Sequence, residues 1–228
     1  MTQSVQAAPP QGLQEPGQGR QGLTRRRAET RERLMDAAIT VFARDGVDQA
    51  RLEDISEEAG YTRGAFYSNF ADKDDLITTL LERQFARATD LATTSIDTAL
   101  AIPGTPSFPD RVSAALDALA DCIPDDEWLI AERSLHLYAM RNPAIAGPLT
   151  AYEAQHRATV GQTLERGLGQ VGLRSVMPMD QLVIIIESVF VDAKMRERIS
   201  ARCGTGDPGL ARDLVISLLA RCLEPAEE

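Results

Sequence analysis

The sequence predicts an all-α protein in which an amino-terminal three-helix unit is joined to a larger helical body. Three observations support this fold class. Apolar residues recur at helical spacing along most of the chain. Glycine, proline and asparagine divide these stretches into segments of helix length. The β-branched run 182–186 lies inside more than twenty residues without glycine or proline, so a buried helix fits it better than a strand.

Composition argues against several classes of protein. The chain has 228 residues, 43% hydrophobic and 25% charged, which is ordinary for a soluble protein with a sizeable core. No run reaches the roughly 18 apolar residues of a membrane span, and no secretory leader is evident, so we expect a cytoplasmic protein without a membrane partner. Three scattered cysteines and two histidines lack zinc-ligand spacing, so we expect no metal. Motifs for a cofactor or a nucleophile are also missing, so we expect no cofactor and no enzyme.

The first 25 residues are predicted to be a disordered tail and a basic arm. Residues 1–23 are rich in Gln, Pro and Gly and have too few large apolar side chains to offset the entropy of ordering. The stretch 20–33 then holds six arginines against two glutamates. This arm is either a solvated lead-in to a helix or a contact to phosphate. The net charge of −10 weakens the second interpretation without excluding it.

The first helix is expected over Thr30–Asp45. Its apolar residues follow the i, i+3, i+4, i+7 spacing of an amphipathic helix, at Leu34, Ala37, Ala38, Val41 and Phe42. Thr30 suits the N-cap, and Gly46 suits the left-handed residue that ends a helix. A second, short helix is expected at about Leu52–Ala59.

Residues 51–70 have the features of a helix-turn-helix, in which two short helices pack at a steep angle. Gly60 permits the positive φ of a tight turn, and Thr62 can cap a third helix over roughly Arg63–Phe70. Phe66 points into the core from that helix. The opposite side is then small and polar, which is the kind of surface that enters a DNA groove.

The side chains on this outer face are suited to DNA contacts. Arg63 can reach a guanine edge or a phosphate. Tyr67, Ser68 and Asn69 can donate to phosphate oxygens. Lys73, at the start of the next helix, is placed for another phosphate.

The stretch Thr30–Leu76 closely resembles the amino-terminal DNA-binding domain of the tetracycline-repressor (TetR) family. The matching residues are Ala37, Ala38, Phe42, Gly46, Asp54, Ile55, Glu57, Ala59, Gly60, Thr62, Arg63, Gly64, Phe66, Tyr67, Asn69, Phe70, Lys73, Asp75 and Leu76. The resemblance implies a DNA-binding domain at 28–88 and a helical ligand-binding and dimerisation domain at 89–228. It also implies DNA contacts from Arg51, Thr62, Arg63, Gly64, Ala65, Tyr67, Ser68, Asn69 and Lys73.

Two places depart from the family pattern. Ala50 and Arg51 stand where a Thr or Ser often caps the second helix, and Glu53 stands where a basic or polar residue is common. Arg51 can replace the hydroxyl by its charge, but the cap is weakened. The affinity and the preferred DNA sequence are therefore left open.

The rest of the chain reads as helical throughout. Helices are expected at about 72–100, 110–122, 125–141, 148–167, 179–201 and 208–222. The apolar run 182–191 and the stripe along 211–222 suit a helix–helix seam, either between two subunits or within one. Aromatic residues with polar neighbours suggest a ligand site at Trp128, His136, Tyr138, Met140 and Phe190, although each of these also fits an ordinary core or surface position.

These features predict a ligand-responsive DNA-binding transcriptional regulator. We expect a homodimeric repressor that binds a palindromic operator in double-stranded DNA and is released by a small-molecule effector. The alternative is a TetR-like module that has lost DNA binding and acts by ligand sequestration or protein interaction. The net charge and Glu53 favour this alternative, whereas Arg63, Tyr67 and Lys73 oppose it.

Overall fold

The computed structural model describes residues 16–101, 107, 110, 112–114, 117, 126–205 and 209–226, with side chains from residue 25 onward. Its elements are α1 (Pro16–Asp45), α2 (Leu52–Glu58), α3 (Arg63–Tyr67), α4 (Lys73–Leu100), α6 (Asp126–Ala139), α7 (Pro143–Gln170), β1 (Leu173–Ser175), α8 (Met179–Arg202), α9 (Leu210–Cys222) and β2 (Leu223–Pro225). The two strands are short and pair antiparallel, so helices make up the fold and the all-α class is confirmed. The expected helix over 110–122 falls largely outside the described residues.

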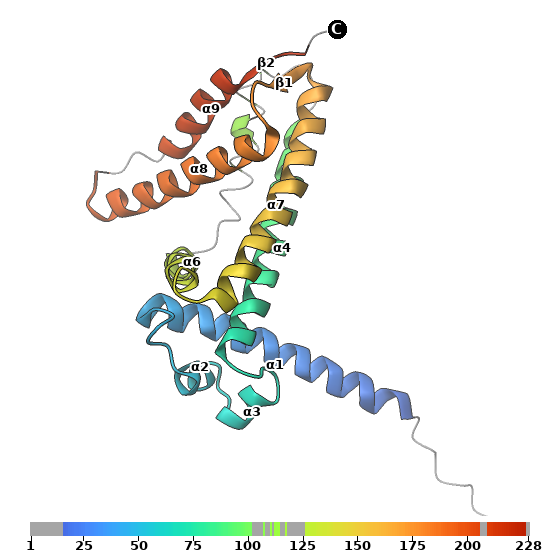
Figure 1. The fold of residues 1–228 in the computed structure, drawn as a ribbon, viewed down its shortest axis with the longest axis vertical. Helices are drawn as coiled ribbons and strands as arrows, with labels where there is room; N and C mark the ends of the chain where they lie inside the picture. Colours follow the sequence, from blue (N-terminus) through green and yellow to red (C-terminus); the bar gives the residue numbers. More distant parts are fainter. Residues whose placement is uncertain are drawn as a thin grey trace, which may run out of the picture.

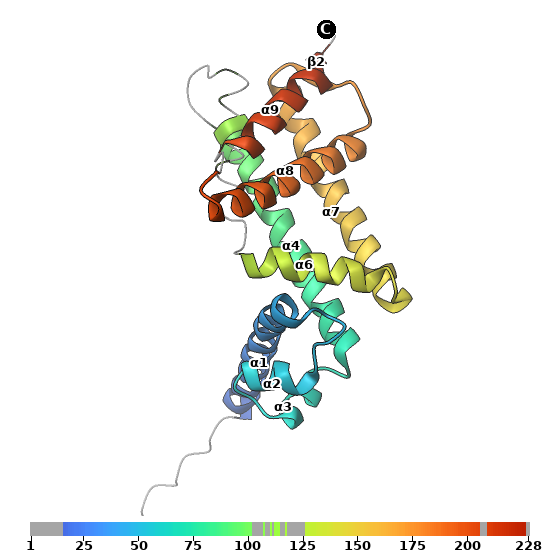
Figure 2. The same ribbon diagram turned by 90° about the vertical axis from the view of Figure 1, so that its left-hand side faces the viewer.

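The molecule consists of a small head and a larger body (Figure 1). The head comprises α1, α2, α3 and the first turns of α4. From the head, α4 continues as one unbroken helix into the body, where it packs along α7. Between head and body, α6 crosses the path of α4, and α8 and α9 pack on each other at the far end (Figure 2). A displacement of α4 in the body would therefore also move its first turns in the head.

One hydrophobic core joins the head to the lower body. Phe42, Ile55 and Phe66 are fully buried in the head. Leu135 of α6 and Ile145 of α7 belong to the same buried cluster and are also fully buried. Burying a side chain of this size stabilises a fold by about 1.5–3 kcal/mol, so α6 is held to the head by substantial apolar contact.

A second, smaller core holds α8 and α9 together. Leu182 and Phe190 of α8 pack with Ala211, Val215, Leu219 and Cys222 of α9. These four residues of the stripe expected along 211–222 therefore face α8 in the same chain, while Leu214 of the stripe is exposed. Three large apolar residues of the same pair of helices remain exposed, Ile184 at 43%, Ile199 at 58% and Leu214 at 43%.

The chain departs from the expected boundaries at its first helix. α1 begins at Pro16, so residues 16–23, expected to be disordered, are helical. Thr30 is consequently inside the helix, and its hydroxyl donates to the Arg26 carbonyl instead of capping. Extending an existing helix costs far less than starting one, and the arginines and Leu23 are good helix formers. Over the described residues, none of the helices is both long and apolar enough to cross a membrane.

Candidate nucleic-acid interface and effector cavity

The α2–turn–α3 segment is fixed by local hydrogen bonds and one aromatic anchor. Gly60 has φ +72°, and the neighbouring Tyr61 N–H donates to the Ser56 carbonyl at 2.8 Å. The Thr62 hydroxyl oxygen accepts from the Ala65 N–H at 3.3 Å, which is the expected cap of α3. Phe66 is fully buried beneath the helix. The outer side of α3 is therefore held in a defined position although the helix is short.

Most of the expected DNA-contacting residues are on the surface. Tyr67 is 48% exposed, and the remaining exposed residues of the set are Arg51, Thr62, Arg63, Gly64 and Ser68. Ala65 is half-buried. Arg63 bridges α3 to α2: one guanidinium nitrogen lies 2.7 Å from the Glu53 carboxylate, and another donates to the Tyr67 hydroxyl at 3.2 Å. In this arrangement Arg63 is already engaged by an acidic neighbour.

Asn69 lies inward. Its side chain is buried, and its Nδ2 donates to the Ala65 backbone carbonyl at 2.8 Å. The backbone carbonyl of Asn69 accepts a hydrogen bond from the Arg31 guanidinium of α1. The Arg31 guanidinium also lies over the Phe70 ring, 4.3 Å from its centre. Arg31 thus ties the end of α3 to α1, a role that the sequence did not indicate because a lone arginine on a helix usually faces solvent.

Lys73 also points into the head. Its Nζ donates to the carbonyls of Val47 and Ala50 at 2.8 and 3.3 Å, and it lies 5.5 Å from the centre of the Tyr138 ring. These two carbonyls belong to the loop between α1 and α2. Lys73 therefore ties that loop to the start of α4.

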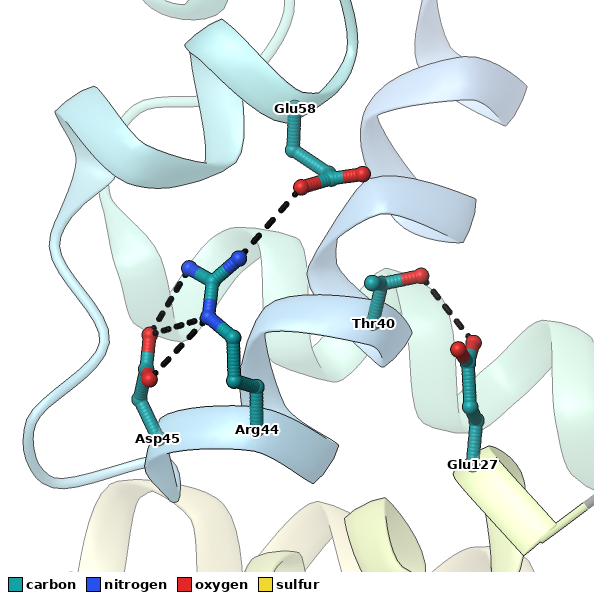
Figure 3. Close-up of polar contacts among 5 residues, drawn as sticks. All are labelled: Thr40, Arg44, Asp45, Glu58 and Glu127. Carbon is teal, nitrogen blue, oxygen red and sulfur yellow. Dashed lines mark hydrogen bonds and ion pairs between the residues drawn. The ribbon is translucent and has the colours of Figure 1, made fainter.

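Polar contacts connect α1 both to α2 and to the body. Figure 3 shows Arg44 held between Asp45 and Glu58 of α2, and Thr40 donating to Glu127 of α6 at 3.1 Å. The Arg44 pairs are exposed and stabilise weakly, but together with Thr40 they fix α1 between its two neighbours.

α6 carries two further contacts to the head. The Ser134 hydroxyl accepts from the Val47 N–H at 2.9 Å. The Tyr138 hydroxyl donates to Asp74, in the first turn of α4, at 3.1 Å. Burial raises the pKa of Tyr138, and the nearby Asp74 charge acts in the same direction, so its phenol stays protonated and donating. A displacement of α6 would act on both the α1–α2 loop and α4.

The body encloses a cavity of about 790 Å³, within the range of small-molecule sites. Its walls come from α1, α4, α6, α7, α8 and α9, and most of the lining is apolar. Two of the residues suggested as ligand contacts, Trp128 and Phe190, line it. The described lining does not include His136, Tyr138 or Met140.

His136, Tyr138 and Met140 lie outside the cavity lining and have other contacts or face solvent. Met140 is 82% exposed at the end of α6. His136 donates from Nε2 to Glu153 of α7 at 3.2 Å, and this bond raises the pKa of His136 and lowers that of Glu153. Tyr138 joins α6 to the head. Periodicity placed all of them on α6, but it did not distinguish the side that faces the cavity.

His156 is one of the cavity residues that sequence reasoning missed. It is 9% exposed; its Nδ1 lies 2.6 Å from the Thr89 hydroxyl of α4, and its Nε2 donates to Glu187 of α8 at 2.7 Å. Phe85 stands beside it, with ring centres 6.0 Å apart. His156 therefore links three helices in the cavity wall. Helical spacing alone gave no signal for it, because its partners are 67 and 31 residues away.

Comparison with known proteins identifies the head. Residues 34–80 match the family model described as bacterial regulatory proteins, tetR family. The segment 34–80 therefore carries a TetR-type DNA-binding head. The chain is 43% identical over 54 residues to the HTH-type transcriptional regulator AcrR of Shigella flexneri, covering 24% of this chain and 25% of that protein. It is 46% identical over 56 residues to the HTH-type transcriptional repressor BepR of Brucella suis, covering 25% and 27%.

These sequence matches span about a quarter of this chain and about a quarter of each of the two relatives. The fold likeness extends further. A TetR-family structure from Mesorhizobium loti superposes with a TM-score of 0.66 over 86% of this chain and 98% of that one, at 18% identity. At that identity the likeness concerns the fold alone. The matching relatives are named as transcriptional regulators, which agrees with the expectation that the chain is not an enzyme.

Proposed function

We propose that this chain is a TetR-family homodimeric transcriptional repressor that binds palindromic double-stranded DNA and leaves it when a small molecule fills the body cavity. The observation that carries the proposal is the outer surface of α3. In a head that matches the TetR-family model, Arg63, Gly64, Tyr67 and Ser68 face solvent while Phe66 anchors the helix from below.

The exposed apolar residues of α8 and α9 support the dimer. Ile184 and Leu214 are large and each 43% exposed, on two helices whose other apolar faces are already packed together. A second copy of the same pair would cover them in a two-fold symmetric contact. A dimer in turn sets two α3 helices on successive major grooves, roughly 34–36 Å apart.

The contacts of α6 support the response to a ligand. Trp128 of this helix lines the cavity, while Ser134 and Tyr138 bind the α1–α2 loop and the start of α4. A ligand that fits the cavity better at another position of α6 would favour a different placement of the head. Such a ligand shifts the population away from the DNA-binding form by its difference in affinity for the two forms.

Selection of bound sequences from a random DNA pool, at two salt concentrations, tests the proposal. We expect an inverted repeat whose binding weakens steeply with salt, because each phosphate contact releases counterions and adds about 0.9 to the logarithmic slope. Recovery of no sequence by the folded protein would contradict the proposal. That result would favour the alternative, a module that has lost DNA binding. The Glu53–Arg63 ion pair and the net charge of −10 also favour this alternative.

The Glu53–Arg63 pair predicts a gain of affinity on mutation. In Glu53→Gln, Arg63 loses its acidic partner and the DNA phosphates lose a repelling charge. Both residues are more than half exposed, so we expect only about a two- to fivefold tighter complex at low salt. Fluorescence anisotropy on a selected oligonucleotide measures it. Glu57→Gln, an exposed carboxylate on the same helix, is the matched control. An equal gain in both variants would mean that charge alone, and not Arg63, is responsible.

A further inference from the structure

The charged residues that line the cavity are unevenly balanced. Four carboxylates lie in its wall, and only one arginine and one histidine oppose them: Asp36, Glu127, Glu132 and Glu187 against Arg87 and His156. The rest of the described lining is polar or apolar without charge. A cavity of this composition attracts positive charge.

Most of these groups already have partners in the protein. Asp36 lies 2.8 Å from Arg83, and Glu127 accepts from Thr40. Arg87 is directed to Glu32, which does not line the cavity, at 3.6 Å. These contacts account for the α1 end of the cavity, so its charge there is largely compensated.

Glu132 is different. Within the described part of the chain its carboxylate makes no hydrogen bond or ion pair, although it lies in the cavity wall of α6. Burial raises its pKa, and the charges of Glu153 and Glu187 add to this, while His136 and Arg133 act against it. His136 is itself bonded to Glu153. Burial thus disfavours the charged form of Glu132, and a positive charge placed beside it in the cavity would favour the carboxylate.

Glu187 lies close enough to Glu132 for their charges to interact, and it receives one hydrogen bond from His156. Aromatic rings complete this part of the wall, from Phe85, Trp128 and Phe190. A lysine nitrogen already stands 5.9 Å from the centre of the Phe190 ring, so the ring accepts a cation on one side. Carboxylates among aromatic faces bind organic cations by charge and by cation–π attraction.

We propose that the cavity binds a bulky, apolar organic cation, with the positive charge near Glu132 and Glu187 and the apolar groups against the aromatic wall. A neutral ligand gains nothing from the charges of these two groups, and an anionic ligand would be repelled by them. That such a cation is the effector rests on the proposed function; that it binds here does not.

Two ions of nearly the same shape and opposite charge test this. Tetraphenylphosphonium and tetraphenylborate are titrated into the full-length protein without DNA. Trp128, the single tryptophan of the chain, lines the cavity, so quenching of its fluorescence reports binding at this site. We expect the phosphonium to bind at least about tenfold more tightly than the borate. Equal binding of the two ions, or no binding of the phosphonium, would overturn the proposal.

Glu132→Gln locates the charge that matters. It keeps the shape of the side chain, and we expect phosphonium affinity to fall roughly tenfold while borate binding improves. Glu165→Gln, an exposed carboxylate of α7 outside the cavity lining, should leave both affinities unchanged. Equal effects of the two substitutions would reduce the preference to the overall acidity of the chain and overturn the site. Release of DNA by the phosphonium is a separate measurement, so a failure to bind DNA leaves these results readable.

Discussion

Replacing Phe66 with alanine is expected to lower the free energy of unfolding by about 3–5 kcal/mol and to abolish DNA binding. The ring is fully buried and packs against Phe70 and Tyr67, with ring centres 5.7 Å apart in both cases. α3 has only five residues and is too short to be stable without this anchor. Chemical denaturation followed by circular dichroism measures the stability, and anisotropy measures binding to the selected DNA.

Tyr67→Ala is the matched control for this prediction. Tyr67 is the next residue of the same helix, but it is 48% exposed, and its hydroxyl accepts a hydrogen bond from Arg63. We expect a loss of stability below about 1 kcal/mol together with weaker DNA binding on all sequences. If both variants lost similar stability, Phe66 would not be the anchor of α3.

The head could be predicted from sequence in considerable detail because its signals are local. A cap needs one side-chain oxygen a few residues from the N–H group that it accepts from, and Thr62 accepts the expected bond from Ala65. Gly46 and Gly60 have the positive φ expected of them. The start of α1 was not predictable in this way, because a helix that is already formed continues into a segment whose composition alone indicates disorder.

The cavity could not be predicted in the same detail because it is a property of the packing between helices. His156 and His136 are both histidines on amphipathic helices, and the sequence singled out only His136. His156 faces the cavity because of how α7 is rotated against α4 and α8, and that rotation is set by contacts far apart in sequence. Trp128 and Phe190 could be proposed as cavity residues because large aromatic residues are scarce in this chain. No local sequence pattern distinguishes Glu132 from the other glutamates.

The same reasoning applies to Lys73, for which sequence and structure suggest different roles. A lysine at the start of α4, beside a helix-turn-helix, suggests a phosphate clamp, since nothing local shows where a long flexible side chain points. In the structure its ammonium group is occupied by the Val47 and Ala50 carbonyls. The charge therefore contributes first to holding the α1–α2 loop, and only through that loop to the placement of α2.

Lys73→Met is accordingly expected to reduce the free energy of unfolding by about 1.5–3 kcal/mol, the usual loss for hydrogen bonds to a charged donor. The methionine keeps most of the apolar stem against Tyr138 but leaves both carbonyls without their donor. Urea denaturation measures the change, and anisotropy at several salt concentrations measures DNA binding in parallel. Arg51→Met is the control, because Arg51 is exposed at the start of α2 and should lower DNA affinity without affecting stability. The reverse pattern in Lys73→Met, unchanged stability with a salt slope smaller by about 0.9, would instead assign Lys73 to a phosphate.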